Sequence, residues 1–541
     1  MRAEVSFLLL VALTTVSGDR FEDNTGQIKN KRLKIFVDSP SIGYSHMQFQ
    51  GRLADLLVDR GHLVDVYISN FNPNERRTGT SKARVFRINA TTETRYGEMD
   101  LFTDPFNAGS ILFQMKRADP YRNTTAQLCY DIVNHPSLID QIRAENYDVI
   151  IAEMFDPCIF YLAEYLQIRT RILSSAMPTP DLVAQALGIP VPRSYIPSVF
   201  SSSADVPNLG WMERLFNVIT DFYHPIVLNE LTERMRNMYK DRFGVDMAEF
   251  KDLLRKSSYL FVNVHDQLDH PRPITRKVQY IGGIAVKKPQ KKHTQEIEEI
   301  FSRPSKGVIL FSMGSVIDST LMPVSMKNAF VDTFDHFKDY TFLWRIKFSV
   351  NDTHRFRNIS NLFTIDWMDQ PTILADPRTK LFITHCGQNS MMEAAYNGVP
   401  VLGFPLWADQ HYNNALLINR GVALHQDTHT TTSESLIRKI STILNDESYY
   451  RNAQILKRKL EDEPFKPEDR FIGLIEYAAR HEDKGELNLY VNELTFVRRN
   501  NLDIYIPMVL IAYLTFYTAK VMLFRIWNQL SNSVIYKQKV A

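Results

Sequence analysis

Short apolar runs alternate with amphipathic stretches along most of the chain, the pattern of a parallel α/β fold. Residues 33–37 are predicted to form a strand, residues 38–46 a loop, and residues 47–59 a helix with one apolar face. Arg60, Gly61 and His62 end that helix, and residues 63–68 are predicted to form the next strand. The chain therefore begins with a strand–helix–strand unit of a parallel sheet.

The same pattern recurs in both halves of the chain. Further strands are predicted over residues 148–152, 307–311, 341–344, 381–384 and 400–403. Between the halves, residues 270–292 lose the apolar periodicity and gain Pro, Gly and Lys, which indicates a linker. The sequence therefore predicts two doubly wound, Rossmann-like domains over residues 19–280 and 281–485, the second with the linker at its start. Ligands of such folds bind where strand ends face a cleft.

Both ends of the chain carry apolar segments. Arg2 precedes an apolar run that ends in small residues, so residues 1–18 read as a signal peptide, with a short buried helix as the alternative. Residues 504–524 contain a single charge, Lys520, and are long enough to span a bilayer. We expect a luminal stem over 486–503, a membrane helix over 504–524 and a cytosolic tail over 525–541.

The last five residues place Lys537 and Lys539 where endoplasmic-reticulum membrane proteins carry a dilysine retrieval signal. A basic tail without any address is the alternative. Together with the two apolar segments, this predicts a single-pass protein of that membrane with luminal domains. Four Asn-x-Ser/Thr sequons fit a luminal glycoprotein, at Asn89, Asn123, Asn351 and Asn358.

Composition narrows the class of protein. The 541 residues have a net charge of +2, which argues against a nucleic-acid-binding protein with a concentrated basic face. Three cysteines exclude a disulfide framework. Cys129 and Cys158 are the one pair to consider, and the expectation is that no bridge forms.

The most informative segment covers residues 367–410. In it, a strand runs into a turn of small and polar residues, His385 to Ser390, and a helix is predicted over 391–396. Unpaired backbone N–H groups at a helix start favour a bound phosphate. The segment resembles the signature of the UDP-glycosyltransferases, specifically the animal UDP-glucuronosyltransferase branch. It departs from that family at Cys386, where the family has glycine, and at Gln388, where it more often has Thr. We expect Cys386 to keep the turn with a negative φ.

The resemblance implies a GT-B glycosyltransferase fold, with the acceptor in the N-terminal domain and the UDP-sugar in the C-terminal domain. It implies that Trp367 and Gln370 hold uracil, that Glu393 holds the ribose, and that Asp409 and Gln410 contact the sugar. The residues expected at the diphosphate are Ser312, Gly314, Ser315, His385, Gly387, Asn389 and Ser390. The turn at 312–315 could also be an ordinary tight turn, and Ser390 with Glu393 also fits a capping box.

His46 lies at the end of the loop after the first strand and matches the family's general base. A histidine suits proton removal because its pKa lies near neutrality. Glu153 ends another strand and is expected to orient His46, with Asp156 as the rival.

No Asp-x-Asp and no cysteine–histidine cluster occurs, so no metal cofactor is expected. The predicted function is inverting transfer of a hexose or hexuronic acid, from UDP-glucuronate or UDP-glucose, to hydroxyl or amine groups of small lipophilic acceptors. The alternative is a catalytically silent member that binds UDP-sugars or partners an active enzyme. Homo- or hetero-oligomers are compatible with either reading.

Overall fold

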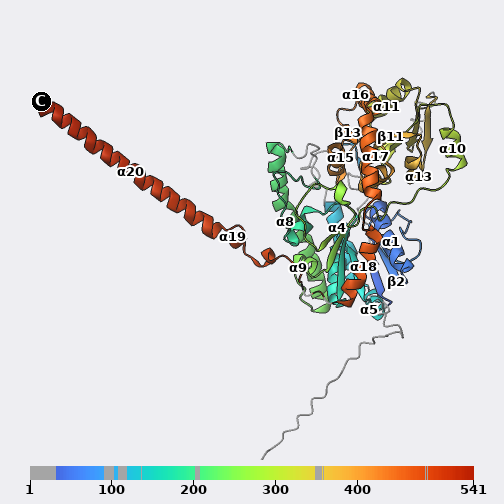
Figure 1. Cartoon of the computed structure of the whole chain (residues 1–541). Helices are drawn as coiled ribbons and strands as arrows, with labels where there is room; N and C mark the ends of the chain where they lie inside the picture. Colours follow the sequence, from blue (N-terminus) through green and yellow to red (C-terminus); the bar gives the residue numbers. More distant parts are fainter. Residues whose placement is uncertain are drawn as a thin grey trace, which may run out of the picture.

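A computed structural model describes residues 32–89, 103–107, 119–135, 137–200, 208–347, 356, 359–481, 483 and 485–540. Two α/β bodies lie against each other, and a long helix at the C-terminus projects from the first of them (Figure 1). Each body is built on one parallel sheet. The predicted signal peptide and the sequons at Asn351 and Asn358 lie outside the described residues, whereas Asn123 is exposed on a helix.

The N-terminal sheet has the strand order β3-β2-β1-β4-β5-β6-β7, all parallel. Its strands are β1 (Lys34–Asp38), β2 (Leu63–Ser69), β3 (Arg84–Ile88), β4 (Val149–Glu153), β5 (Thr170–Ser175), β6 (Tyr259–Val262) and β7 (Val278–Tyr280). The order reverses direction between β1 and β4. Loops that leave these neighbouring strands on opposite faces open a crevice at their carboxyl ends. Glu153 ends β4, and the turn before α1 follows β1, so both lie at this crevice.

The C-terminal sheet has the order β10-β9-β8-β11-β12-β13 and is also parallel. Its strands are β8 (Val308–Ser312), β9 (Thr341–Arg345), β10 (Leu362–Ile365), β11 (Thr379–Thr384), β12 (Val401–Gly403) and β13 (Ala423–His425). The reversal here falls between β8 and β11. Ser312 and Thr384 end these two strands side by side, so the turns that follow them meet.

Helices cover both faces of each sheet. In the N-terminal half they are α1 (Tyr44–Asp59), α4 (Asp119–Asn134), α5 (Leu138–Ala144), α6 (Pro157–Tyr165), α7 (Asp181–Ala186), α8 (Trp211–Phe243) and α9 (Phe250–Arg255). In the C-terminal half they are α10 (Gln295–Phe301), α11 (Val324–His336), α13 (Gln370–Ala375), α14 (Gln388–Asn397), α15 (Gln410–Asn419), α16 (Ser433–Asn445) and α17 (Glu447–Glu461). The chain ends in α18 (Pro467–Arg480), α19 (Phe496–Arg499) and α20 (Leu502–Val540). Short 3₁₀ turns are η2 (Asp266–Leu268), η3 (Ser319–Leu321) and η4 (Tyr490–Glu493).

The predicted two-domain fold is confirmed, and three local expectations need correction. The first helix begins at Tyr44, so His46 lies in its first turn instead of in the preceding loop. The predicted linker is shorter, because Val278–Tyr280 forms strand β7. Helix α14 begins at Gln388, earlier than the apolar pattern of residues 391–396 suggested. Helices α1 and α14 thus extend into polar residues that carry no apolar period.

Cys129 and Cys158 form a disulfide, contrary to the expectation that no bridge forms. Their Cα atoms lie 5.5 Å apart because α4 and α6 pack against each other. This distance is in the range that a disulfide requires. Cys386, the third cysteine, is free and buried.

Helix α18 crosses back from the C-terminal domain and packs on the N-terminal sheet beside α1 (Figure 1). The sequence-based boundary places these residues in the second domain, whereas Phe471, Ile475 and Ala478 belong to the core under the first sheet. The Phe471 ring meets Phe261 of β6 edge-on, with 5.0 Å between centroids. The chain therefore passes between the domains twice.

Helix α20 carries an apolar segment, Leu502–Asn532, that is long enough to cross a membrane and has no residue buried against the protein. It includes the predicted span 504–524 and continues as helix through the predicted tail. Such a fully exposed apolar helix fits a membrane anchor.

We expect Phe471→Ala to destabilise the protein by about 3–5 kcal/mol, because the ring is fully buried and its removal leaves a cavity. Tyr477→Ala on the same helix is the control, since that ring is 50% exposed and should change the free energy of unfolding by less than about 1 kcal/mol. Denaturant unfolding of the detergent-solubilised chain measures both. Equal effects would show that α18 does not stabilise the N-terminal core.

Candidate active site

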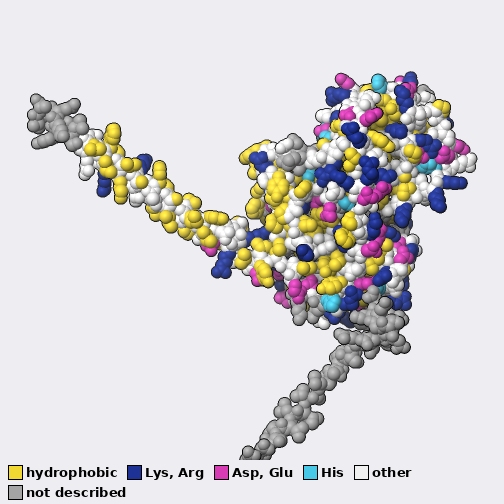
Figure 2. Space-filling model, viewed as in Figure 1, with side chains coloured by type: hydrophobic (Ala, Val, Ile, Leu, Met, Phe, Trp, Pro, Cys, Tyr) yellow, Lys and Arg dark blue, Asp and Glu magenta, His cyan; other side chains and the backbone are white. Residues whose placement is uncertain are grey.

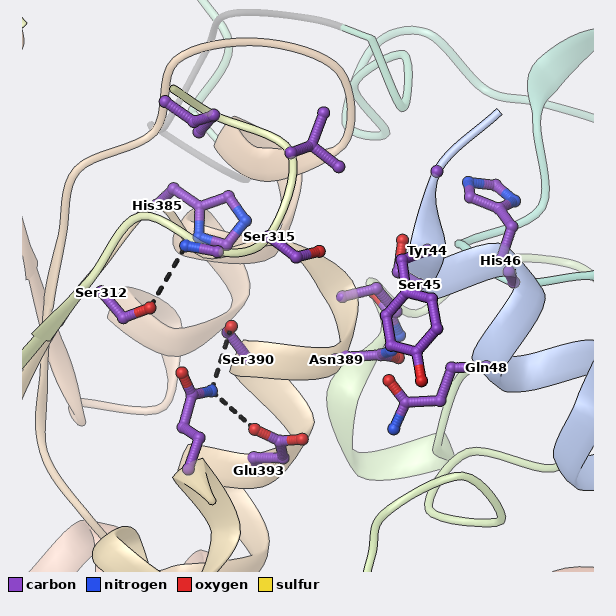
Figure 3. Close-up of a pocket in the computed structure, with 18 of the residues that line it drawn as sticks. Tyr44, Ser45, His46, Gln48, Ser312, Ser315, His385, Asn389, Ser390 and Glu393 are labelled. Atoms are coloured by element: carbon purple, nitrogen blue, oxygen red, sulfur yellow. Dashed lines mark hydrogen bonds between the residues drawn. The ribbon is translucent and has the colours of Figure 1, made fainter. Parts of the chain in front are cut away.

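A cleft of about 590 Å³ lies between the carboxyl ends of the two sheets. His46 lines it from the N-terminal domain, and all twelve residues predicted to bind the donor line it from the C-terminal domain (Figure 3). These twelve are Ser312, Gly314, Ser315, Trp367, Gln370, His385, Gly387, Asn389, Ser390, Glu393, Asp409 and Gln410. Glu153 is fully buried behind His46 and does not line the cleft.

His385 is held between two turns that contain glycine. A Cβ on Gly314 would lie 2.5 Å from the imidazole, and a Cβ on Gly387 would lie 2.6 Å from it. Gly314 also has φ of +75°, a conformation that glycine adopts without strain. The turns after β8 and β11 can therefore approach the ring only because both residues lack side chains.

Burial and the nearby Arg345 guanidinium lower the pKa of His385 to about 4. The imidazole is therefore neutral at pH 7 and carries one N–H that can donate to an anion. A bound diphosphate would counter the effect of the Arg345 charge, because negative charge nearby favours the imidazolium.

Cys386 adopts φ of +62°, so the expected negative φ is wrong. The turn keeps the left-handed conformation that a glycine would take, at a strain of about 1–2 kcal/mol for a residue with a side chain. The Sγ atom is fully buried and points at the Thr384 carbonyl and the Asn414 side chain, at 3.7 and 3.6 Å. The side chain packs into the domain and leaves the cleft side of the turn to backbone.

Gln388 extends from the donor turn to the other domain. Its side-chain amide donates to the carbonyl of Asn263, just after β6, and the Asn263 side chain donates to Asn389 at 3.3 Å. A threonine at this position is too short for the first contact. Gln388 therefore adds a hydrogen bond between the domains at the edge of the cleft.

Glu393 faces Gln370 across the cleft wall. The Gln370 amide donates to the Glu393 carboxylate at 2.6 Å and to Ser390 Oγ at 3.3 Å (Figure 3). Burial raises the pKa of Glu393 to about 7, although the Gln370 amide opposes the shift. The capping-box alternative is wrong, because Gly387 is the N-cap of α14 and Ser390 lies inside the helix. Glu393 is thus free to accept from a ligand.

Asp409 and Gln410 begin helix α15, and both are largely buried. Asp409 accepts from Asn413 at 2.8 Å and interacts electrostatically with His46 across the cleft. Burial raises its pKa. The Gln410 oxygen accepts from the Leu406 amide at 2.8 Å, so only its NH₂ group remains for a ligand.

His46 and Glu153 form a pair at the other wall. His46 Nδ1 lies 3.7 Å from Glu153 Oε1, and neither atom has a hydrogen-bond partner among the described residues. Gln50 of α1 donates to the other Glu153 oxygen and to Ser174 Oγ, which fixes the carboxylate. The rival Asp156 caps α6 and accepts from Ser69 at 2.8 Å. Glu153 is therefore the carboxylate positioned toward the imidazole.

Two arginines absent from the sequence-based set flank Trp367. The Arg345 guanidinium lies 5.0 Å from the indole and donates to the Gly314 carbonyl. The Arg77 guanidinium lies 5.3 Å from the indole and 3.6 Å from the Tyr44 ring, so it bridges the domains. Arg345 ends strand β9, and this strand-end position could have revealed it.

The loop that carries Arg77 is fixed on α1. Asp55 accepts from the backbone amides of Ser81 and Lys82, both at 3.0 Å, and from the Ser81 hydroxyl. Gly51 and Gly79 bring the two backbones so close that a Cβ on Gly51 would lie 2.2 Å from Gly79. These tertiary contacts position Arg77, and no local pattern in the sequence announces them.

Within the part of the chain that the structure describes, no group of three His, Cys, Asp or Glu side chains is arranged to hold a metal ion. The positive charges on the cleft wall come from Lys287, Lys288 and Arg345. Backbone amides, a neutral histidine and these cations can together hold an anion.

The chain matches the family described as "UDP-glucoronosyl and UDP-glucosyl transferase" over residues 39–534. A putative UDP-glucuronosyltransferase, ugt-48 of Caenorhabditis elegans, is 28% identical over 90% of this chain and 94% of its own length. UDP-glucuronosyltransferase 2B33 of Macaca mulatta is 29% identical over 92% of this chain and 96% of its own. Both relatives therefore span the two domains.

Solved structures share the fold at low sequence identity. UGT2 of Phytolacca americana, in complex with UDP-2fluoro-glucose and pterostilbene, has a TM-score of 0.54 at 16% identity over 83% of this chain and 100% of that one. Os79 of O. sativa has a TM-score of 0.58 at 18% identity over 83% and 99% of the two chains. These likenesses establish the two-domain glycosyltransferase architecture.

Gly387→Ala should weaken UDP binding by about tenfold or more, because the new methyl group displaces His385 from its place between the turns. Gly473→Ala is the control, since a Cβ there meets nothing within 4 Å and lies on helix α18. Isothermal titration with UDP measures both affinities. Unchanged UDP affinity in Gly387→Ala would show that the position of His385 does not matter for the ligand.

Proposed function

The chain belongs to the UDP-glucoronosyl and UDP-glucosyl transferase family, and from that premise we propose which reaction it performs and with which residues. The family activity is glycosyl transfer from a UDP-sugar. The specific proposal is inverting transfer of a hexose or hexuronic acid to hydroxyl or amine groups of small lipophilic acceptors. The observation that carries it is one cleft in which His46 faces the donor residues of the other domain.

The donor would lie along the C-terminal wall. Trp367 offers its ring and Gln370 its amide to uracil, and Glu393 accepts from the ribose hydroxyls. The turns around Gly314 and Gly387, with His385 between them, would hold the diphosphate. This order follows the wall of the cleft and leaves Asp409 and Gln410 for the sugar.

The transfer step would begin at His46. Its Nε2 removes the proton from the acceptor hydroxyl as the oxygen attacks the anomeric carbon, and the bond from that carbon to the UDP oxygen breaks. The proton remains on the imidazole, and UDP carries away the electron pair. Attack opposite the leaving group inverts the anomeric centre. Glu153, 3.7 Å from Nδ1, stabilises the imidazolium, and His385 with Arg345 stabilises the departing diphosphate.

The charges on the wall favour a neutral sugar. Lys287 acts on Glu393, Lys288 is its neighbour in the chain, and Arg345 contacts Trp367 and Gly314, so these cations belong to the nucleotide end. Asp409, which we assign to the sugar, is an acid. A hexuronic carboxylate would meet repulsion there, so we infer that UDP-glucose is preferred to UDP-glucuronate.

The C-terminal helix supports a membrane-anchored enzyme. We propose a single-pass protein of the endoplasmic reticulum with both domains in the lumen. The disulfide between Cys129 and Cys158 fits an oxidising lumen. Lipophilic acceptors concentrate in membranes, which suits an anchored enzyme.

The alternative is a silent member that binds UDP-sugars or modulates an active partner. The strained Cys386 and the inter-domain contact of Gln388 are the features that distinguish this chain at the donor turn. Neither removes a residue from the cleft wall. The pairing of His46 with Glu153 is the arrangement that general-base catalysis requires, so we favour catalysis.

We expect the full-length chain, reconstituted in vesicles, to transfer glucose from UDP-glucose to phenols. Transfer of glucuronic acid from UDP-glucuronate should be slower. His46→Ala should lower the rate by at least about 100-fold, because the general base is lost, while UDP affinity stays unchanged. His429→Ala is the control, because that histidine is exposed and outside the cleft. Released UDP and glycoside are both measured.

UDP binding without UDP release from any donor would establish the silent alternative. Equal turnover in His46→Ala would remove His46 from the mechanism. Preference for UDP-glucuronate would overturn the inference on the sugar and leave the transferase assignment intact.

Glu153→Gln should lower kcat by about 100-fold or more and leave the donor KM unchanged, because the amide cannot stabilise the imidazolium. Glu153→Asp should restore part of kcat. Asp156→Asn is the comparison: its side-chain oxygen can still cap α6, so kcat should stay close to that of the unchanged chain. The opposite pattern would make Asp156 the partner of His46.

A further inference from the structure

The first half of helix α8 exposes apolar side chains and buries polar ones. Between residues 211 and 226, every residue in the exposed class is apolar, and the two buried residues are Asn217 and Thr220. The exposed residues are Trp211, Met212, Leu215, Val218, Ile219, Phe222 and Ile226. In the second half, the exposed residues from Asn229 onward are all polar or charged. The pattern of exposed apolar and buried polar residues is therefore confined to the first half of α8.

The exposed set forms a single face, because its members recur every three or four residues along the helix. We call this set the α8 face. Phe222 is 70% exposed, Ile226 67% and Trp211 65%. Hydrophobic side chains gather over α8 at the edge of the molecule, on the side from which α20 leaves (Figure 2). An apolar surface of this kind marks a contact with a partner or a membrane.

Polar contacts hold the opposite side of the helix in place. Asp221 accepts from Arg193 Nε at 2.7 Å and from Gln185 at 2.9 Å. The Asn217 side chain accepts from the Ser198 amide at 3.2 Å. Asp221 and Asn217 thus form hydrogen bonds with the rest of the N-terminal domain, and the apolar face of this half points outward.

The root of the membrane anchor is attached next to α8. Helix α7 donates from Gln185 to Asp221 of α8, and the Leu187 carbonyl at its end accepts from Asn492 of the stem at 3.2 Å. The stem then leads through α19 into α20. Both α8 and α20 lie on the same side of the body (Figure 1). The α8 face therefore lies on the side of the body from which the membrane helix leaves.

We propose that the α8 face inserts into the interface of the bilayer that α20 spans. The face carries no charge, so burial of apolar side chains drives the contact and anionic lipids are not required. Trp211 at its start is suited to the headgroup level. The body then contacts the membrane at two places, the anchor and the α8 face. This proposal does not depend on the transfer chemistry.

A fluorescent label on the α8 face tests the contact in the full-length chain. Phe222→Cys accepts a thiol-reactive NBD group selectively, because Cys386 is buried and the other two cysteines are bridged. Asn237→Cys, on the polar half of the same helix, is the matched control. In phosphatidylcholine vesicles the label at position 222 should gain intensity several-fold and be quenched by doxyl-labelled lipids. The label at position 237 should show neither effect.

Equal, water-like emission from both labels would overturn the proposal. A gain of intensity at position 222 without quenching by lipid would also overturn it, and would assign the face to a second copy of the chain. UDP-dependent thermal stabilisation of each labelled protein verifies that it is folded.

Cleavage of the anchor gives a second test. A protease site inserted at Asn501, between α19 and α20, allows the body to be cut from its anchor in reconstituted vesicles. The body should stay with the vesicles at high salt, and the double variant Phe222→Ser/Ile226→Ser should be released at least about tenfold more completely. Equal release of the two bodies would contradict insertion of the α8 face.

Discussion

A buried charged cluster joins the N-terminal domain to helix α15, whose first residue, Gln410, lines the cleft. Asp269 accepts from Tyr280 of β7 and, at 2.5 Å, from Tyr412 of α15, while Arg272 donates to Tyr412. A carboxylate and a guanidinium removed from water are tolerated only when each is paired and hydrogen-bonded. Tyr412 comes from the other domain, so separating the sheets would remove one hydrogen bond from Asp269 and one from Arg272. The cluster thereby stabilises the arrangement in which the strand ends of the two sheets face each other.

Desolvation then sets the charge state of the cleft. It makes His385 neutral, with a pKa of about 4, and raises the pKa of Glu393 to about 7 and that of Asp409 above its ordinary value. The nucleotide end of the wall is thus less charged than its residue types suggest, and an entering diphosphate meets the neutral His385 and a Glu393 that is partly protonated near pH 7. On the acceptor side, Phe200 lines the cleft and its ring meets His224 of α8 edge-on. One helix therefore separates the acceptor end of the cleft from the face proposed to enter the bilayer.

The sequence predicted the fold and the composition of the cleft wall well, because both depend on strands and on the turns at their ends. The strands over 148–152 and 381–384 are continuous apolar runs, and the structure has them within two residues as β4 and β11. The start of α1 was misplaced because Gly43 caps it without a side-chain signal. The bridge between Cys129 and Cys158 depends on the packing of α4 on α6, and Arg77 depends on a loop held by Asp55. Contacts between distant segments leave no local pattern, so reading the chain along its length could not reveal them.

The two passages of the chain between the domains limit how the cleft can open. They cover residues 281–294 and 462–466, and they adjoin, because Arg470 donates to the Tyr280 carbonyl at 2.8 Å. Because the two passages adjoin, they can serve together as one hinge for rotation of one domain against the other. The first passage also brings Lys287 and Lys288 to the cleft wall, so hinge and ligand share residues. Nucleotide binding and the angle between the domains are then thermodynamically linked. If a bound nucleotide favours one angle, holding the domains at that angle raises the affinity for the nucleotide.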